Sequence, residues 1–115
     1  MEKNPTYFDT KTIILNLLNE DKKTYLSIER LNKLLSFIYH ELKEKCKLGE
    51  YDILFDINFE AIERTVIYNN NIFSLDIEGD KIYLKDDQDL NSLTQQYKVD
   101  QTVFEIIKKF KNNAA

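Results

Sequence analysis

The chain has 115 residues, of which 43% are hydrophobic, and a formal net charge of −4. This size fits a single domain over residues 1–115 with its own core, and the composition favours a folded globule over a disordered chain. No apolar run approaches the roughly 20 residues that cross a bilayer, and the first residues form no apolar signal segment. The single cysteine, Cys46, cannot form an internal disulfide. We therefore expect a cytoplasmic protein with no membrane partner.

The charge is distributed unevenly along the sequence. Residues 1–50 carry a net charge of +1, residues 51–100 carry −7 and residues 101–115 carry +2. An acidic segment repels a phosphate backbone and attracts a basic partner, although an ordinary solvated acidic surface would give the same count. The chain is also rich in Lys, Asn, Ile and Tyr and has only two Arg. AT-rich codons produce this bias, which favours a bacterial or phage source.

The first half of the sequence predicts two capped helices. Asp9 is predicted to cap a helix over 10–19, because its carboxylate can accept a hydrogen bond from a backbone amide of the first turn. Ser27 is predicted to cap a longer helix over about 28–47, whose apolar residues recur at spacings of three and four. We expect this long helix to be central to the packing. Gly49 is expected to take the left-handed conformation after its last turn.

The second half predicts shorter elements. Alternating apolar residues predict a half-buried strand over 51–57, and a short helix is predicted over 58–68. Asp100 is predicted to cap a C-terminal helix, whose lysines complement the negative end of the helix dipole. Residues 1–6 and 112–115 are expected to fray.

A β-hairpin is predicted between these helices, with strands at 72–77 and 82–86. The loop Gly79-Asp80 would close it as a two-residue type II′ turn. In that register, apolar residues face each other across the strands: Ile77 with Ile82, and Leu75 with Leu84. The charged pair Glu78 and Lys81 falls on the other face, so pattern and turn agree.

Together these elements predict a small α+β domain, with a long central helix and other helices packed against an antiparallel sheet. The hairpin forms this sheet, and strand 51–57 is a candidate to join it. The order of strand, short helix and hairpin between flanking helices resembles that of a winged-helix domain. The resemblance is to an order of elements and not to any family motif. It implies that helix 58–68 and the hairpin would be the parts that contact DNA.

The charge of these parts argues against DNA. Helix 58–68 carries Glu60 and Glu63 against one basic residue, Arg64. DNA affinity rests mainly on Lys and Arg contacts with phosphate. Basic residues lie instead on the long helix and at the C-terminus, so DNA is the less favoured partner.

His40 and Cys46 are the residues that invite a catalytic interpretation. His40 begins the sequence His-Glu-Leu-Lys-Glu, which is similar to the zinc motif H-E-x-x-H but has Glu44 in place of the second histidine. Because no third ligand is available, we expect a surface histidine. Cys46 lies on a different face of the helix, and we expect a half-buried small apolar residue there.

The acidic run Asp86, Asp87 and Asp89 resembles a calcium loop only in part. Ser92 stands where an EF-hand requires glycine, and Lys98 stands where it requires a bidentate glutamate. The sequence also has no Gly-rich phosphate loop and no G-x-S-x-G turn. We therefore predict no enzyme activity, no cofactor and no metal site.

These observations favour a non-catalytic protein-binding module with an acidic face, such as an inhibitor, antitoxin, immunity or phage counter-defence protein. Its partner would be another protein with a basic surface, and a homodimer is compatible with the sequence. The residues predicted to contact the partner are Asp56, Glu60, Glu63, Arg64, Asp76, Glu78, Tyr83, Asp86 and Asp87. Four tyrosines are candidates for partial exposure: Tyr25, Tyr39, Tyr68 and Tyr83.

Two other classes of protein remain open. A winged-helix transcriptional regulator would bind DNA, and a dimer is expected for it. A structural accessory subunit of a larger assembly would expose an extensive apolar patch in the isolated chain.

Overall fold

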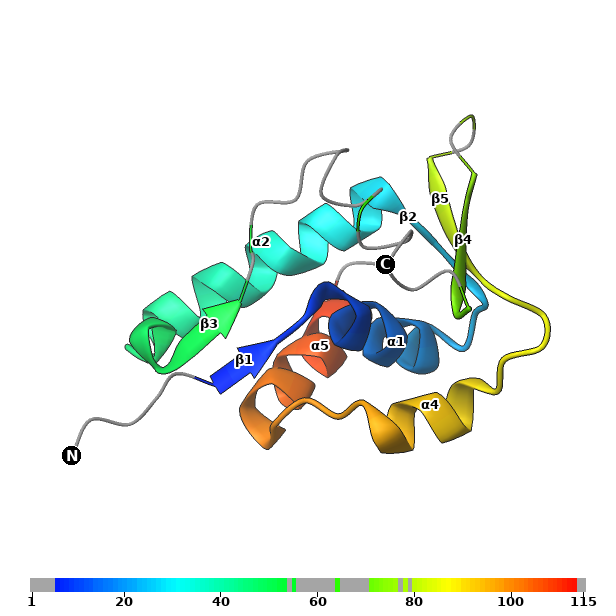
Figure 1. Cartoon of the computed structure of the whole chain (residues 1–115). Coiled ribbons are helices and arrows are strands. Elements are labelled where there is room, and N and C mark those ends of the chain that lie inside the picture. The colour runs from blue at the N-terminus through cyan, green and yellow to red at the C-terminus, as the bar shows by residue number, and fades with distance from the viewer. Residues whose placement is uncertain are drawn as a thin grey trace.

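The computed structural model describes residues 6–53, 55, 64, 71–76, 78 and 80–113. Helices, a three-stranded antiparallel sheet and a parallel pair of short strands make up this part of the chain, which confirms the predicted α+β class. In chain order the elements are β1 (Thr6–Phe8), α1 (Thr10–Asp21), β2 (Tyr25–Ser27), α2 (Ile28–Glu44), a 3₁₀ turn (Leu48–Glu50), β3 (Tyr51–Ile53), β4 (Phe73–Asp76), β5 (Lys81–Leu84), α4 (Leu90–Gln96) and α5 (Gln101–Asn113). Figure 1 shows the helices grouped together, with the hairpin β4–β5 at one end and the pair β1–β3 at the other.

Helix α1 is the most completely buried helix in the part of the chain that the structure describes. Asp9 caps it as predicted, because the Thr12 amide donates a hydrogen bond of 2.9 Å to the Asp9 Oδ1. Every residue from Thr12 to Leu18 is buried, since α4, α5 and β2 all contact this helix. A helix that is buried all round needs neighbours on all sides, and α1 has them.

Helix α2 is the long helix that the sequence predicts. Ser27 caps it, accepting a hydrogen bond of 3.1 Å from the Arg30 amide. Its buried face packs against α5 and consists of Leu31, Leu34, Leu35, Ile38, Glu41 and Leu42. The polar Glu41 within this apolar stripe is the one residue that the hydrophobic pattern alone does not explain.

The end of α2 differs from the prediction. The helix ends at Glu44, and Cys46, not Gly49, takes the left-handed conformation, with φ of 56°. The Cys46 amide donates to the Lys43 carbonyl (3.1 Å) and the Lys47 amide to the Leu42 carbonyl (2.9 Å), which together form a Schellman motif. Cys46 is exposed because the reversal of the chain turns it away from the core, so the prediction of a half-buried cysteine is wrong.

The three-stranded sheet has the order β2-β5-β4, and all its pairs are antiparallel. Strand β2 was not predicted, because three residues between two helices carry too little alternation to reveal a strand. The predicted strand 51–57 does not join this sheet over its described part. Instead β3 pairs in parallel with β1, with Thr6 opposite Tyr51 and Phe8 opposite Ile53.

The hairpin register is shifted by two residues from the predicted one. Leu75 faces Ile82, and Phe73 faces Leu84, so the connection spans residues 77–80 instead of two residues. The Ile28 amide donates to the carbonyl of Asp80 (2.9 Å), which ties this end of the hairpin to the start of α2. Because side chains alternate with a period of two, a two-residue shift keeps the same side chains on the inner face. The hydrophobic pattern could therefore not distinguish the two registers.

The C-terminal helix α5 begins as predicted. The Val103 amide donates a hydrogen bond of 2.9 Å to Oδ1 of Asp100. Strand β1 begins at Thr6 and α5 continues to Asn113. The fraying expected at 1–6 and 112–115 stays a prediction, as does the single domain over the whole chain. The predicted helix 58–68 lies outside the described residues, apart from Arg64.

Candidate functional site

The sheet separates an apolar inner face from a polar outer face. In the register of the three strands, Tyr25, Tyr83 and Ser74 form one outward row, since Tyr83 lies opposite both of the others. The inner face places Leu26 opposite Ile82, and both side chains are fully buried against the helices. On this outer face Tyr25 and Ser74 are exposed and Tyr83 is half-buried.

Two tyrosines form the centre of the outer face. The rings of Tyr25 and Tyr83 lie 5.9 Å apart between centroids and are tilted by 36°. Two ammonium groups flank the same ring, Lys23 at 5.7 Å and Lys81 at 5.3 Å from the Tyr25 centroid. Tyr25 is 40% exposed and is the only exposed large hydrophobic residue in the part of the chain that the structure describes. Exposed tyrosines beside charged groups are common in protein interfaces.

Carboxylates lie at both ends of the hairpin. Asp76, Glu78 and Asp80 are exposed at its turn, and Asp86 and Asp87 are exposed just after β5. Strand β5, which contains Tyr83, separates the two groups, and Tyr25 on β2 lies opposite Tyr83. The predicted acidic surface is thus divided into two clusters with an aromatic centre between them.

The predicted contact residues are only partly brought together. Asp76, Glu78, Tyr83, Asp86 and Asp87 belong to the hairpin and the turn that follows it. Arg64 is exposed but belongs to a different segment of the chain. Asp56, Glu60 and Glu63 lie outside the described residues.

The sequence did not reveal the role of β2 at this surface. Tyr25 was expected to be partly exposed, but nothing local placed it beside Tyr83. Tyr83 and Tyr39 are half-buried, and Tyr68 lies outside the described residues. The positions of Lys23 and Lys81 beside the Tyr25 ring were not predicted either, because only the pairing of β2 with β5 brings their ammonium groups to one ring.

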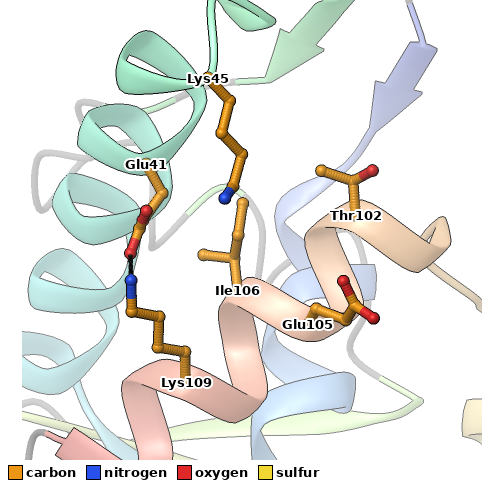
Figure 2. A pocket seen from close by; sticks show the side chains of 6 residues that line it. All are labelled: Glu41, Lys45, Thr102, Glu105, Ile106 and Lys109. Atoms are coloured by element: carbon orange, nitrogen blue, oxygen red, sulfur yellow. Dashed lines mark ion pairs between the residues drawn. The ribbon is translucent and has the colours of Figure 1, made fainter.

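A second candidate site is a pocket of about 200 Å³ between α2 and α5. Its lining consists of Glu41, Lys45, Thr102, Glu105, Ile106 and Lys109. Glu41 and Lys109 form an ion pair across the two helices, with Glu41 buried and Lys109 exposed. Figure 2 shows this pair on one side, the Lys45 side chain extending from the end of α2 toward Ile106, and Thr102 and Glu105 on the other side. None of these six residues was predicted to line a pocket, because the pocket depends on the contact of two helices distant in sequence.

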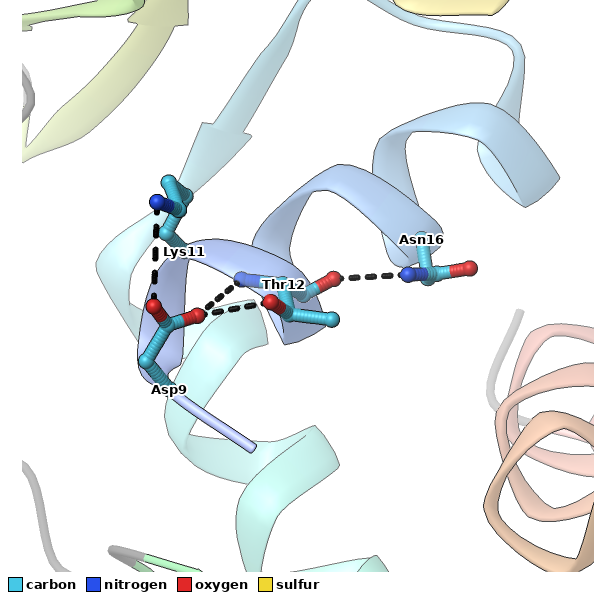
Figure 3. A network of polar contacts seen from close by, with 4 residues as sticks. All are labelled: Asp9, Lys11, Thr12 and Asn16. Atoms are coloured by element: carbon cyan, nitrogen blue, oxygen red, sulfur yellow. Dashed lines mark hydrogen bonds and ion pairs between the residues drawn. The ribbon is translucent and has the colours of Figure 1, made fainter. Parts of the chain in front are cut away.

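A polar network near the start of α1 has a structural role. The Asp9 Oδ1 accepts from the Thr12 hydroxyl at 2.7 Å, and the Lys11 ammonium lies 3.8 Å from the Asp9 Oδ2. The side-chain amide of Asn16 donates to the backbone carbonyl of Thr12 at 2.8 Å (Figure 3). The same amide group donates to the Tyr97 carbonyl at 3.0 Å. This network joins α1 to the end of α4.

The motifs considered for chemistry form no metal centre among the described residues. His40 is exposed, and its ring packs edge-on against Tyr39 at 5.6 Å between centroids. No group of three His, Cys, Asp or Glu residues in this part of the chain is arranged to hold a metal ion. No described helix combines the length and apolar character that a membrane span requires.

Comparisons with protein-family models, with curated proteins and with solved structures found no match to this chain.

Proposed function

We propose that this chain is a non-catalytic protein-binding module whose hairpin surface contacts a protein partner with a basic surface. The observation that supports this most is the outer face of the sheet. There the exposed Tyr25 packs against Tyr83, and exposed carboxylates lie at both ends of the same hairpin. Aromatic side chains at the centre and charges at the rim are the usual arrangement of a protein interface.

The two parts of this surface would act differently. The carboxylates of Asp76, Glu78, Asp86 and Asp87 would attract a basic partner from a distance and exclude phosphate-rich partners. Tyr25 and Tyr83 would provide the apolar contact that holds the complex. An inhibitor, antitoxin, immunity or phage counter-defence protein of the cytoplasm would use such a surface to cover a basic groove on its target.

The test is a comparison of two variants that each remove four carboxylates. One variant carries Asp76→Asn, Glu78→Gln, Asp86→Asn and Asp87→Asn. The control carries Glu29→Gln, Glu44→Gln, Glu50→Gln and Asp52→Asn, which are exposed elsewhere. We expect a protein captured by the wild-type chain at low salt to be retained by the control and lost by the hairpin variant. Equal retention by both variants would rule out the acidic surface as the binding site.

A winged-helix DNA-binding regulator is the second candidate. The observation that favours it is the strand order, because the strand between the first two helices pairs with the second strand of the hairpin. The carboxylates at the hairpin turn argue against it, since contacts with phosphate need Lys and Arg. A gel-shift titration on random DNA distinguishes this regulator from the protein-binding module. The absence of a shift at low salt would dismiss DNA binding.

The accessory-subunit alternative receives no support from the described residues. It requires an extensive exposed apolar patch, whereas Tyr25 is the only large hydrophobic side chain exposed in this part of the chain.

A further inference from the structure

The pocket between α2 and α5 lies apart from the hairpin and is not used by the proposed function. We propose that it binds a free α-amino acid as the zwitterion. Lys45 would bind the carboxylate, Glu105 would bind the ammonium group, and Ile106 would contact the side chain. This inference is independent of the partner surface, so either can fail without the other.

The charges of the lining indicate a zwitterion. Four of the six lining residues are charged, two of each sign. Glu41 and Lys109 satisfy each other in an ion pair. The remaining two are Lys45 and Glu105. Lys45 has no ion-pair partner among the described residues. The Oε1 of Glu105 accepts only a neutral hydrogen bond of 3.2 Å, from the side-chain amide of Gln101. One ammonium and one carboxylate are therefore left to bind groups of opposite sign.

These two groups come from different elements of the chain. Lys45 follows the last residue of α2, whereas Glu105 lies in α5. Figure 2 shows them on different sides of Ile106, with the Thr102 hydroxyl on the Glu105 side. In an α-amino acid the ammonium and the carboxylate are bonded to the same carbon, so a ligand held between Lys45 and Glu105 at these two groups would direct its side chain toward Ile106. The Thr102 hydroxyl can donate or accept one further hydrogen bond.

The size of the pocket limits the ligand. Its volume of about 200 Å³ is below the roughly 300–1,000 Å³ of pockets that take drug-sized ligands. A single amino acid is therefore of suitable size. A simple anion is less suitable, because the lining carries no net charge.

Titration of the ¹⁵N-labelled chain followed by NMR tests this proposal. The probe is L-leucine, and the controls are 4-methylpentanoate, which lacks the amino group, and 3-methylbutylamine, which lacks the carboxylate. We expect saturable shifts of the Lys45, Thr102 and Ile106 amides with leucine, with a Kd on the order of 1 mM. Each single-charge control should bind about fivefold more weakly, the upper value for one exposed ion pair.

Variants assign the two charged groups of the ligand. Lys45→Met and Glu105→Gln should each weaken leucine binding about threefold to fivefold. Lys33→Met removes an exposed lysine of α2 outside the pocket and should leave binding unchanged. Circular dichroism of each variant checks that the fold is intact. Binding of 4-methylpentanoate as tight as that of leucine, or no saturable shift with leucine, glycine or glutamate, would overturn the proposal.

Discussion

The hydroxyl of Tyr51 lies 2.5 Å from Oδ2 of Asp100, so the start of β3 is bonded to the residue that caps α5. The other carboxylate oxygen of Asp100 accepts from the Val103 amide. One carboxylate thus joins two segments that are far apart in the sequence. Burial and the hydrogen bond to Asp100 raise the pKa of Tyr51 from its usual 10.0 to about 12.

The raised pKa of Tyr51 predicts a loss of stability at high pH. Below pH 10 the phenol is protonated in both the folded and the unfolded chain, and its contribution to the free energy of unfolding is complete. As the pH rises from about 10 to about 12, the unfolded chain releases the proton more readily than the folded one, so this contribution is lost. Urea unfolding between pH 8 and 12 should show a steeper decline for the wild type than for Tyr51→Phe. Parallel curves would contradict the assignment to Tyr51.

Removal of the Asp100 carboxylate should lower the free energy of unfolding more than removal of the Tyr51 hydroxyl. We expect Tyr51→Phe to lower the free energy of unfolding by about 1 kcal/mol, the net value of one hydrogen bond. Asp100→Ala should cost about 2 kcal/mol, because the cap of α5 is lost as well. A double-mutant cycle measured by urea unfolding gives the coupling between the two side chains. Asp100→Asn is the control, since an amide oxygen can still accept the Val103 bond.

Arg30 should stabilise the packing of three helices. Its Nε and one terminal nitrogen donate to the two oxygens of Asp21, at 2.9 and 2.8 Å, and its guanidinium lies 5.0 Å from the Phe110 ring centroid. The side chain of Asp21 is only 8% exposed. Arg30→Met would leave that buried charge without its guanidinium partner and should cost about 3 kcal/mol.

Arg30→Lys tests whether a positive charge without the bidentate hydrogen bonds is enough to stabilise Asp21. It keeps the charge but cannot form the bidentate pair, so we expect a loss of about 1–2 kcal/mol. Adding Asp21→Asn to Arg30→Met should recover part of the stability, because the buried charge is removed. Thermal and urea unfolding of the three variants measure these differences. A double variant less stable than Arg30→Met would contradict the role of the unpaired carboxylate.

Gly49 and Cys46 offer a direct test of how α2 ends. Gly49 does not have a positive φ, and an added Cβ would meet no atom within 4 Å. Gly49→Ala should therefore raise the free energy of unfolding by about 0.4–1 kcal/mol, through loss of entropy in the unfolded chain. Cys46→Gly should also stabilise, by up to about 1 kcal/mol, since it relieves the left-handed conformation of a non-glycine residue. Destabilisation by Gly49→Ala would instead favour Gly49 as the left-handed residue.

Asn16 should hold α4 against α1. Its side-chain amide donates hydrogen bonds to the backbone carbonyls of Thr12 and Tyr97, and Asn16 itself is buried. Asn16→Ala should cost about 1–2 kcal/mol, because a buried carbonyl loses its donor. Hydrogen exchange should report faster opening of α4 in this variant, with little change in α2. Equal acceleration in both helices would mean that Asn16 acts on the whole fold.

Tyr25 should matter for binding more than for folding. It is the exposed member of the tyrosine pair, so Tyr25→Ser should change the free energy of unfolding by less than about 1 kcal/mol. If the hairpin surface is the partner site, the same change should weaken capture of the partner at least tenfold, as expected of a central aromatic contact. Tyr39→Ser is a control on α2, away from the hairpin. Equal effects of the two changes on capture would contradict a central role for Tyr25.

Local signals in the sequence predicted where α1, α2 and α5 begin. The caps at Asp9, Ser27 and Asp100 all form as predicted, because a cap depends on residues three or four positions apart. The same signals identified the hairpin and the inner face of its strands. They did not identify the end of α2, since either Cys46 or Gly49 could take the left-handed conformation and only the geometry of the chain reversal distinguishes them.

The tertiary structure alone decided the remaining relationships. Strands of three residues have almost no pattern of their own, so the pairing of β2 with β5 and of β1 with β3 depends on contacts between distant segments. Those pairings bring Tyr25 to Tyr83, and the packing of α2 on α5 forms the charged pocket. The sequence determined where α1, α2 and α5 begin and which face of each hairpin strand is apolar. The hairpin register, the aromatic centre and the pocket required the fold, because the free energy of each depends on groups that no local window contains.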